Sequence, residues 1–338
     1  DINGEAPDDY SGRSVSLSAD GTIVAIGAPI NNANNANDGN GGIISNSGHV
    51  RVYQYDGVIW AQQGADIDGE AADDYSGESV SLSADGSIVA IGATLNDGNG
   101  SNSGHVRVYN YINGGWAQIG ADINGEAAAD ESGYSVSLSA DGSIIAIGAN
   151  LNDGTGYDSG HVRVYQRDST VPLGWAQIGG DIDGEAAEDE SGISVSLNGD
   201  GTIVAIGAPG NDGTDAYNSI YGHVRIYKYI NTVWTQIGSD IDGEAENDLS
   251  GNSVSLSADG SIVAIGAIGN DGNNGTESGH VRVYELKLSA GKGAMTISDN
   301  VVVSKVGSNT VTINYNDEFN NAATPVTRTV NVVDTTPP

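Results

Sequence analysis

The chain has 338 residues, no cysteine and a formal net charge of −33, from 45 acidic and 12 basic residues. A charge of this sign and size is repelled by phosphate backbones and anionic membranes, so the composition argues against a nucleic-acid binder. No apolar stretch is long enough to insert directly into a membrane. The absence of cysteine excludes disulfides and thiol chemistry and is compatible with an exported protein.

One unit of sequence contains four predicted strands. In its second copy, SVSLS at 79–83 alternates apolar and polar residues, and an Asp85-Gly86 turn joins it to the apolar run SIVAIGA at 87–93. An Asn/Asp/Gly-rich loop leads to HVRVY at 105–109, and WAQIG at 116–120 supplies the fourth run. No window has a sustained helical period, so we expect an all-β chain.

The unit is repeated five times. The fifteen residues SVSLSADGSIVAIGA occur at 79–93 and again at 253–267. An acidic-x-Ser-Gly step ends at glycines 12, 77, 133, 192 and 251, and all five histidines stand in Gly-His-Val (His49, His105, His161, His223, His280). Four strands in about 59 residues, repeated, predict a β-propeller of four-stranded blades.

The predicted propeller occupies residues 1–286, with a boundary that extends to about 300 if GAMTIS at 293–298 forms the fourth strand of the last blade. We expect the five blades to close into a ring, because an open arc would expose sheet faces. The alternative is that upstream blades are missing.

The run YSGRSVSLSADGTIVAIGAPINN at 10–32, followed by GHVRVY at 48–53, resembles the FG-GAP repeat of integrin-α-type β-propellers. Ser-Gly stands where that family has Phe-Gly, and IGAP at 26–29 and 206–209 matches its Gly-Ala-Pro element. The resemblance implies seven blades, and the family's calcium hairpin is shortened here to Ser-Ala-Asp-Gly. This shortening argues against calcium at that family position.

From residue 287 the repeat stops. Residues 310–333 follow the strand–turn–strand order of the second half of a bacterial Ig-like domain, which they resemble. We therefore expect 287–338 to be a partial Ig-like β-sandwich segment, continued by further domains of the same polypeptide.

An acidic segment between units carries the candidate metal site. Oxygen side chains recur at positions 1, 3, 5 and 9 of D-I-(D/N)-G-E-A-x-x-D, a spacing typical of calcium loops. The candidate ligands are Asp66, Asp68, Glu70 and Asp74; Asp122, Asn124, Glu126 and Asp130; Asp181, Asp183, Glu185 and Asp189; and Asp240, Asp242, Glu244 and Asp248. The alternative is a solvated turn whose Asp and Ser side chains cap backbone N–H groups.

A second acidic loop, between the second and third predicted strands, contains Asn-Asp-Gly turns and varies in length. Its longest copy, at 28–47, is the candidate ligand-contacting loop, although an Asn-rich loop without function fits equally well. The histidines, the arginines two residues after them and the four tryptophans are predicted to be structural, with His and Arg pairing to acidic loops of a neighbouring blade.

No nucleophile elbow, phosphate loop or unique His–carboxylate–Ser set occurs, so we expect no enzyme. The sequence predicts an exported, extracellular or cell-surface adhesion module that binds a glycan or protein through propeller-face loops, with calcium stiffening the segments between blades. The alternatives are a structural spacer or filament module of a giant surface protein and, less favoured, the non-catalytic part of a secreted polysaccharide-active enzyme.

Overall fold

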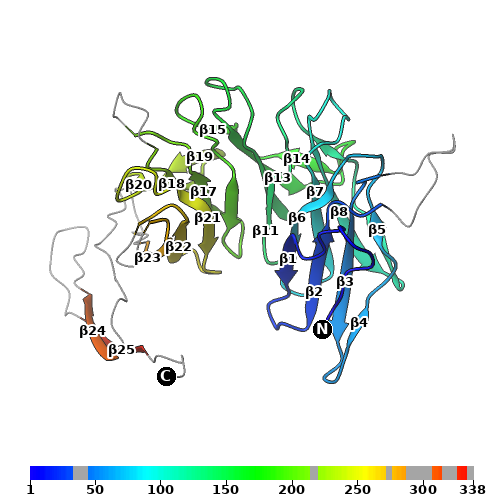
Figure 1. Ribbon diagram of the computed structural model, residues 1–338, viewed down its shortest axis with the longest axis horizontal. Coiled ribbons are helices and arrows are strands. Elements are labelled where there is room, and N and C mark those ends of the chain that lie inside the picture. The colour runs from blue at the N-terminus through cyan, green and yellow to red at the C-terminus, as the bar shows by residue number, and fades with distance from the viewer. Residues whose placement is uncertain (33–44, 214–219, 272–275, 287–306, 314–325, 333–338) are drawn as a thin grey trace.

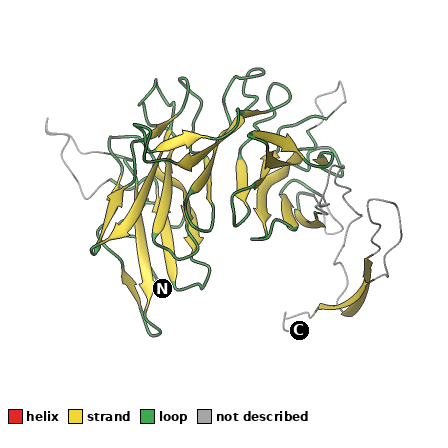
Figure 2. Ribbon diagram, turned by 180° about the vertical axis from the view of Figure 1, so that it is seen from behind, coloured by secondary structure: helices red, strands yellow, loops and turns green. Residues whose placement is uncertain are grey.

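The computed structural model describes residues 1–32, 45–213, 220–271 and 276–286, and the backbone of 307–313 and 326–332. The described residues form strands and turns without a helix, in five successive sheets (Figures 1 and 2). Accordingly, none of the described segments is a helix that could cross a membrane.

Each sheet is one sequence repeat. The first contains β1 (Ser14–Leu17), β2 (Ile23–Ala28), β3 (His49–Tyr55), β4 (Trp60–Gln62) and β5 (Ile67–Asp68). The second contains β6 (Ser76–Leu82), β7 (Ile88–Ala93), β8 (His105–Ile112), β9 (Gly115–Gln118) and β10 (Ile123–Asn124). The third contains β11 (Ser135–Leu138), β12 (Ile144–Ala149), β13 (His161–Arg167), β14 (Trp175–Gln177) and β15 (Ile182–Asp183). The fourth contains β16 (Ser194–Leu197), β17 (Ile203–Ala208), β18 (His223–Ile230), β19 (Val233–Gln236) and β20 (Ile241–Asp242), and the fifth β21 (Ser250–Leu256), β22 (Ile262–Ala267) and β23 (His280–Glu285).

Within a sheet, successive long strands pair antiparallel in the order β1-β2-β3-β4, which confirms the four predicted strands of a propeller blade. The turn between the first two strands is fixed by its aspartate. In the second blade, Asp85 Oδ1 accepts hydrogen bonds from the Ser83 and Ser87 hydroxyls and from the Ser87 N–H, while Gly86 takes a positive φ of 69°. A two-residue strand that was not predicted, β5 in the first blade, pairs with the start of the third strand.

The core lies between successive blades. Val106 and Val108 of β8 pack with Ile145 and Ile147 of β12, and the equivalent strands repeat this contact along the chain. Because both faces of a middle blade are covered, β7 and β17 are buried at every position. The apolar run SIVAIGA is thus explained by burial on two sides.

Serine and glycine fix the approach of one blade to the next. Ser135 Oγ donates to the carbonyl oxygen of Gly192 at 2.7 Å, and Leu197 N donates to Ser137 Oγ at 2.9 Å. A Cβ at Gly148 would overlap the same Gly192 carbonyl. The serines of the first strand and the glycine of Ile-Gly-Ala therefore permit a backbone approach that larger residues would block.

Each tryptophan after the first also crosses to the preceding blade. Trp116 Nε1 donates to Gln63 O at 2.8 Å, Trp175 Nε1 to Ile119 O at 3.0 Å, and Trp234 Nε1 to Ile178 O at 2.8 Å. Trp175 is only 2% exposed. The prediction of inter-blade packing for these residues is confirmed.

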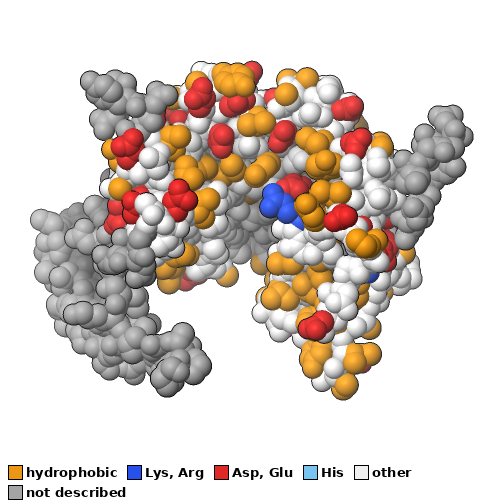
Figure 3. All heavy atoms as spheres, in the orientation of Figure 1, with side chains coloured by type: hydrophobic (Ala, Val, Ile, Leu, Met, Phe, Trp, Pro, Cys, Tyr) orange, Lys and Arg blue, Asp and Glu red, His pale blue; other side chains and the backbone are white. Residues whose placement is uncertain are grey.

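The closed five-bladed ring expected from the sequence is not formed by the described residues. The innermost strands contact one another from β1 through β6, β11 and β16 to β21, but no comparable contact joins β21 to β1. Leu17 of β1 is 61% exposed whereas Leu138, its counterpart in β11, is 8% exposed, and Val281 of β23 is 67% exposed. The five described blades are therefore joined by four such junctions, and a notch remains between the first and the fifth, visible in Figure 3.

Beyond residue 286 the structure describes one two-stranded antiparallel sheet, β24 (Gly307–Ile313) and β25 (Val326–Val332). These strands fall within the stretch predicted to be Ig-like, but a sandwich is not present among the described residues. The Ig-like segment stays a prediction. GAMTIS at 293–298 and most of the 28–47 loop lie outside the described residues.

Candidate functional site

The polar residues of interest gather at one end of the blades, where the third strand of each blade begins. We call this end the upper face, because it is uppermost for β3 in Figure 1. It carries the loops between second and third strands and the acidic segments that join one blade to the next. Two features of interest lie there: a cluster repeated at each blade junction and a hollow beside the fourth blade. A further cavity of about 530 Å³ lies at the next junction, lined by Glu246, Ile268 and Glu277 among others.

The repeated cluster is built from an arginine of one blade and the acidic segment of the blade before it. Arg107 Nη2 donates to the carbonyl oxygen of Asp68 at 2.7 Å, and its Nη1 lies 3.3 Å from Glu70 Oε1. The Arg107 guanidinium also lies over the Tyr109 ring at 5.6 Å. Four arginines make equivalent contacts: Arg51, Arg163, Arg225 and Arg282.

The hydrogen bond to the carbonyl is the stronger part of this contact. Glu70 is nearly half exposed, so its ion pair contributes at most about 1 kcal/mol. Arg107 is 5% exposed, and a buried charged donor to a carbonyl contributes about 1.5–3 kcal/mol. The predicted pairing of arginine with the acidic loop of a neighbouring blade is confirmed, with the loop backbone as the main acceptor.

The histidine of each blade lies beside this arginine, and in the first four blades it faces carboxylates from two segments. Glu/His/Asp groups whose candidate ligand atoms all lie within 4.8 Å of one another occur four times: Glu5, His49 and Asp66; Glu70, His105 and Asp122; Glu126, His161 and Asp181; and Glu185, His223 and Asp240. The donor set of each group could hold a metal ion. In the fifth blade, Glu244 Oε2 lies 3.7 Å from His280 Nδ1.

Burial keeps these imidazoles neutral. It lowers the pKa of His105 to about 4, helped by the positive charge of Arg107, and it lowers the pKa of His161 to about 4, helped by Arg163. The pKa values of His49 and His223 are lowered for the same first cause. A neutral imidazole is the form that binds metal ions.

The candidate calcium ligands are divided among different neighbours. Asp66 faces the histidine of its own blade, whereas Glu70 faces Arg107 and His105 of the next. Asp74 is buried, and its Oδ2 accepts from Ala71 N at 3.0 Å and Asn96 Nδ2 at 3.1 Å. The other position-9 residues, Asp130, Asp189 and Asp248, are bonded in the same way.

Among the described residues, no three Asp or Glu side chains of one acidic segment therefore gather as ligands. Position 9 follows the alternative reading, in which an aspartate caps backbone N–H groups. At position 3, the side chains of Asp68 and Asp242 are exposed. The arginines donate hydrogen bonds to the backbone carbonyl oxygens at this position, those of Asp68, Asn124, Asp183 and Asp242. Calcium binding by these segments stays a prediction.

The sequence analysis did not predict that the histidines lie beside the candidate metal ligands. A signal was present, because the histidine precedes the first aspartate of the next acidic segment by 17 residues in three of the four groups. Glu5, in the first copy of the segment, was not among the candidate ligands either.

The second feature, which we call the hollow, is a cavity of about 420 Å³ on the upper face between the third, fourth and fifth blades. Its lining includes Tyr157 and Pro209 from the loops between second and third strands, and Glu190, Ile193 and Leu249 from the junctions. Backbone hydrogen bonds from Glu188 N to Tyr157 O and from Glu190 N to Asp158 O hold its walls together.

The hollow breaks the repeat. Tyr157 stands where the first two repeats have Ser45 and Ser101, and it is 68% exposed. Ile193 lies at a position that differs in every repeat, where the others have Arg13, Glu78, Tyr134 and Asn252. The hollow is also acidic: burial raises the pKa of Glu190, and repulsion from Asp158 and Glu188 adds to that effect.

Comparison with known proteins supports the blade architecture. Residues 66–109 match the family model of the FG-GAP repeat. No curated protein matches the sequence significantly. Among solved structures, a proposed 6-phosphogluconolactonase from Bacteroides uniformis aligns with a TM-score of 0.55 and 11% identity over 95% of this chain and 86% of that chain. The periplasmic gluconolactonase PpgL of Pseudomonas aeruginosa aligns with a TM-score of 0.50 and 14% identity over 95% and 85%.

Hydrazine synthase of Kuenenia stuttgartiensis aligns with a TM-score of 0.48 and 13% identity over 80% of this chain, which spans 64% of that chain. At these identities the solved structures bear on the fold alone. The chain thus contains an FG-GAP repeat at 66–109 and five related sheets that resemble propeller blades.

Proposed function

We propose that this protein is a non-enzymatic recognition module of the extracellular or cell-surface type, which binds a glycan through the hollow on its upper face. The observation that carries this proposal is that the hollow is lined by a residue that departs from the repeat, Tyr157, beside the variable Ile193. A residue that only joins blades has no reason to differ at one junction, whereas a ligand needs an asymmetric site.

The chemistry of the hollow favours a neutral or positively charged ligand. Asp158, Glu188, Glu190 and Asp212 line it, and ionised carboxylates accept hydrogen bonds from hydroxyl and amino groups but donate none. The exposed ring of Tyr157 offers an apolar face to the C–H side of a sugar. A polyanionic glycan would be repelled both by these carboxylates and by the net charge of −33.

The proposal that the chain is no enzyme rests on the symmetry of its polar groups. Each buried histidine lies in a cluster that recurs at the next blade, and no histidine lines the hollow. A carboxylate such as Glu190 is itself able to act as a general acid or base, so the assay for reducing ends below tests this part of the proposal.

The test is a binding screen of neutral and amino-sugar oligosaccharides, followed by titration of the ligand found. Tyr157→Ser restores the residue of the first two repeats, so the blade should remain folded, and we expect at least a tenfold loss of affinity. Tyr10→Ser is the matched control, because Tyr10 is 62% exposed and lies outside the hollow.

Equal affinity of the two variants would refute the assignment of the hollow. Absence of any ligand in the screen would favour the structural spacer, and release of reducing ends would favour an enzyme.

A further inference from the structure

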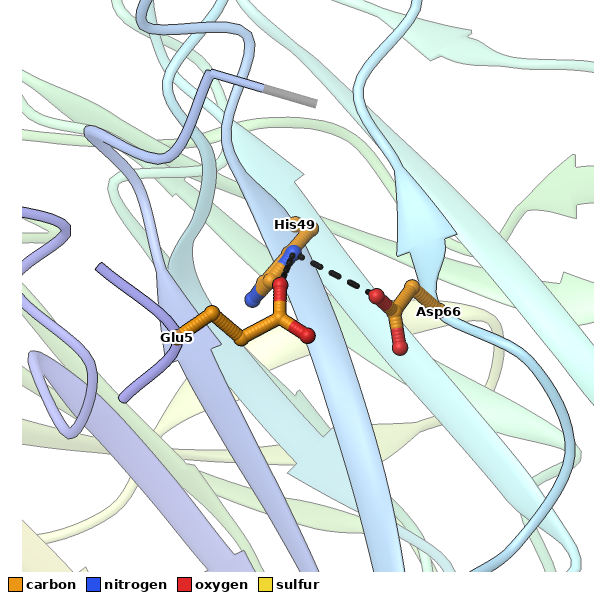
Figure 4. A group of neighbouring side chains, drawn as sticks. All are labelled: Glu5, His49 and Asp66. Carbon is orange, nitrogen blue, oxygen red and sulfur yellow. Dashed lines mark ion pairs between the residues drawn. The ribbon is translucent and has the colours of Figure 1, made fainter. Parts of the chain in front are cut away.

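The first Glu/His/Asp group shows how its three side chains are held. Glu5 lies in the segment before β1, His49 begins β3, and Asp66 directly precedes β5 (Figure 4). Glu5 Oε2 lies 3.8 Å from His49 Nδ1, and Asp66 Oδ2 lies 3.9 Å from the same nitrogen. Three segments far apart in sequence thus aim one donor atom each at a common point.

The other oxygen of each carboxylate is already engaged. Arg51 Nη1 lies 3.3 Å from Glu5 Oε1, and Gln62 Nε2 donates to Asp66 Oδ1 at 2.5 Å. These contacts orient both carboxylates so that the remaining oxygens, Oε2 and Oδ2, face the imidazole. Outer-sphere hydrogen bonds orient metal ligands in this way.

The imidazole itself is buried and lacks a partner on the side facing the carboxylates. His49 is 1% exposed, and its Nδ1 makes no hydrogen bond among the described residues. A buried polar atom left without a hydrogen-bond partner destabilises the folded state. The unpartnered atom is the one that Glu5 and Asp66 face. The cluster therefore contains a nitrogen that is able to bind a metal ion and that no protein group engages.

We propose that Glu5, His49 and Asp66 form a binding site for a divalent first-row transition ion, with Zn²⁺ as the representative. One imidazole nitrogen and two carboxylate oxygens are a common donor set for such ions, whereas calcium takes oxygen ligands only. Bonds of about 2.0–2.1 Å in a tetrahedral site separate ligand atoms by about 3.3 Å. The two distances from His49 Nδ1, 3.8 and 3.9 Å, therefore need to shorten by about half an ångström.

Charge favours the ion. The two carboxylates and Arg51 leave the cluster with a net charge of −1 before a cation binds, because the imidazole is neutral. Arg51 keeps its bonds to Glu5 Oε1 and to the carbonyl oxygen of Asn3 at 2.9 Å, so it need not leave.

The glutamine and arginine contacts recur at three further junctions, where the imidazole nitrogen without a hydrogen-bond partner is Nε2 in place of Nδ1. Gln118, Gln177 and Gln236 donate to Asp122, Asp181 and Asp240 as Gln62 does to Asp66, and Arg107, Arg163 and Arg225 engage the other oxygen of the glutamate. We therefore expect between one and four bound ions per chain. The site is distinct from the hollow, so its presence or absence does not bear on glycan binding.

The experiment starts from chelator-treated protein, which is mixed with excess ZnCl₂ in a buffer containing 5 mM CaCl₂, desalted and analysed for bound zinc. The wild-type chain should retain one to four equivalents, and calcium should not displace them. Asp66→Asn keeps the side-chain shape and an oxygen for Gln62, and it should retain one equivalent fewer or bind it at least tenfold more weakly. Glu78→Gln is the matched control, since Glu78 pairs with Arg13 away from the clusters.

A second readout is made on the wild-type protein and uses a variant only for signal assignment. Zinc should shift the NMR signals of the His49 ring in the wild-type protein. These signals are assigned by their loss in His49→Gln. Retention of no zinc, equal retention by Asp66→Asn and wild type, or unshifted His49 signals would each overturn the proposal.

Discussion

The buried histidines make a quantitative prediction about acid stability. The pKa values of His105 and His161 are about 4 in the folded chain, against an ordinary value of 6.5. Between these two pH values each imidazole is neutral when folded and protonated when unfolded. The folded state is therefore destabilised as pH falls from 6.5 towards 4, and the contribution is fully present only above 6.5.

The size follows from the difference of about 2.5 between the two pKa values, which corresponds to about 3 kcal/mol for each histidine. At pH 4.5 about 2.5 kcal/mol of that contribution is lost. Carboxylates act in the opposite direction, because burial raises the pKa values of Glu131 and Glu190 and favours the folded state in acid. The histidine contribution to the pH dependence of stability must therefore be separated from that of the carboxylates.

The assay is urea unfolding of the wild type and of His161→Gln at pH 7 and at pH 4.5. The variant lacks the titrating ring, so the stability advantage of the wild type over it should shrink by about 2.5 kcal/mol at the lower pH. An NMR titration of the His161 ring should give a pKa near 4. A constant stability difference between the two proteins, or a ring pKa near 6.5, would refute the argument from burial.

Two further substitutions test the packing between blades. Gly148→Ala places a methyl group against the Gly192 carbonyl and should destabilise the protein by about 3 kcal/mol or more in urea unfolding. Gly114→Ala is the control: its methyl group enters open space at a positive φ, and it should destabilise the protein by about 1 kcal/mol. Equal losses of stability in the two variants would contradict the close-approach argument. Trp175→Phe removes the hydrogen bond to the Ile119 carbonyl but keeps most of the apolar contact, so we expect the free energy of unfolding to fall by about 1–3 kcal/mol. Unchanged stability of the variant in thermal unfolding would show that this hydrogen bond contributes nothing.

The blade was predictable because its signals are local. Asp85-Gly86 marks a hairpin, and the alternation in SVSLS and HVRVY marks strands whose register the turn then sets. The exact repetition of these signals predicted the number of sheets. Inter-blade roles of His, Arg and Trp also followed, because a residue repeated once per unit must serve the junction that is repeated once per unit.

The composition of the clusters was not predictable from spacing alone. Asp66 and Glu70 are four residues apart, yet the blade junction runs between them, so they face different histidines. A pattern read along the chain groups neighbours in sequence, whereas a propeller groups residues across sheets. The openness of the arc was missed for a similar reason, since the turn per blade is set by contacts such as Ser135 with Gly192.

The hollow was missed because it depends on departures from the repeat. The sequence directed attention to the longest loop, at 28–47, and to residues present in every copy. Tyr157 is a single exception in a region of ordinary length, Ile193 lies at a position that differs in every repeat, and only their approach on the upper face gives them a common role.

The central claim is that the repeated residues join the blades while the residues that break the repeat bind the ligand. The most direct measurement is amide hydrogen exchange with and without the oligosaccharide selected by the screen. We predict slower exchange in 155–160 and 186–193, which line the hollow, and no change in the turn at 141–143 on the opposite end. Protection at the 141–143 turn instead, or no protection around the hollow, would contradict the claim.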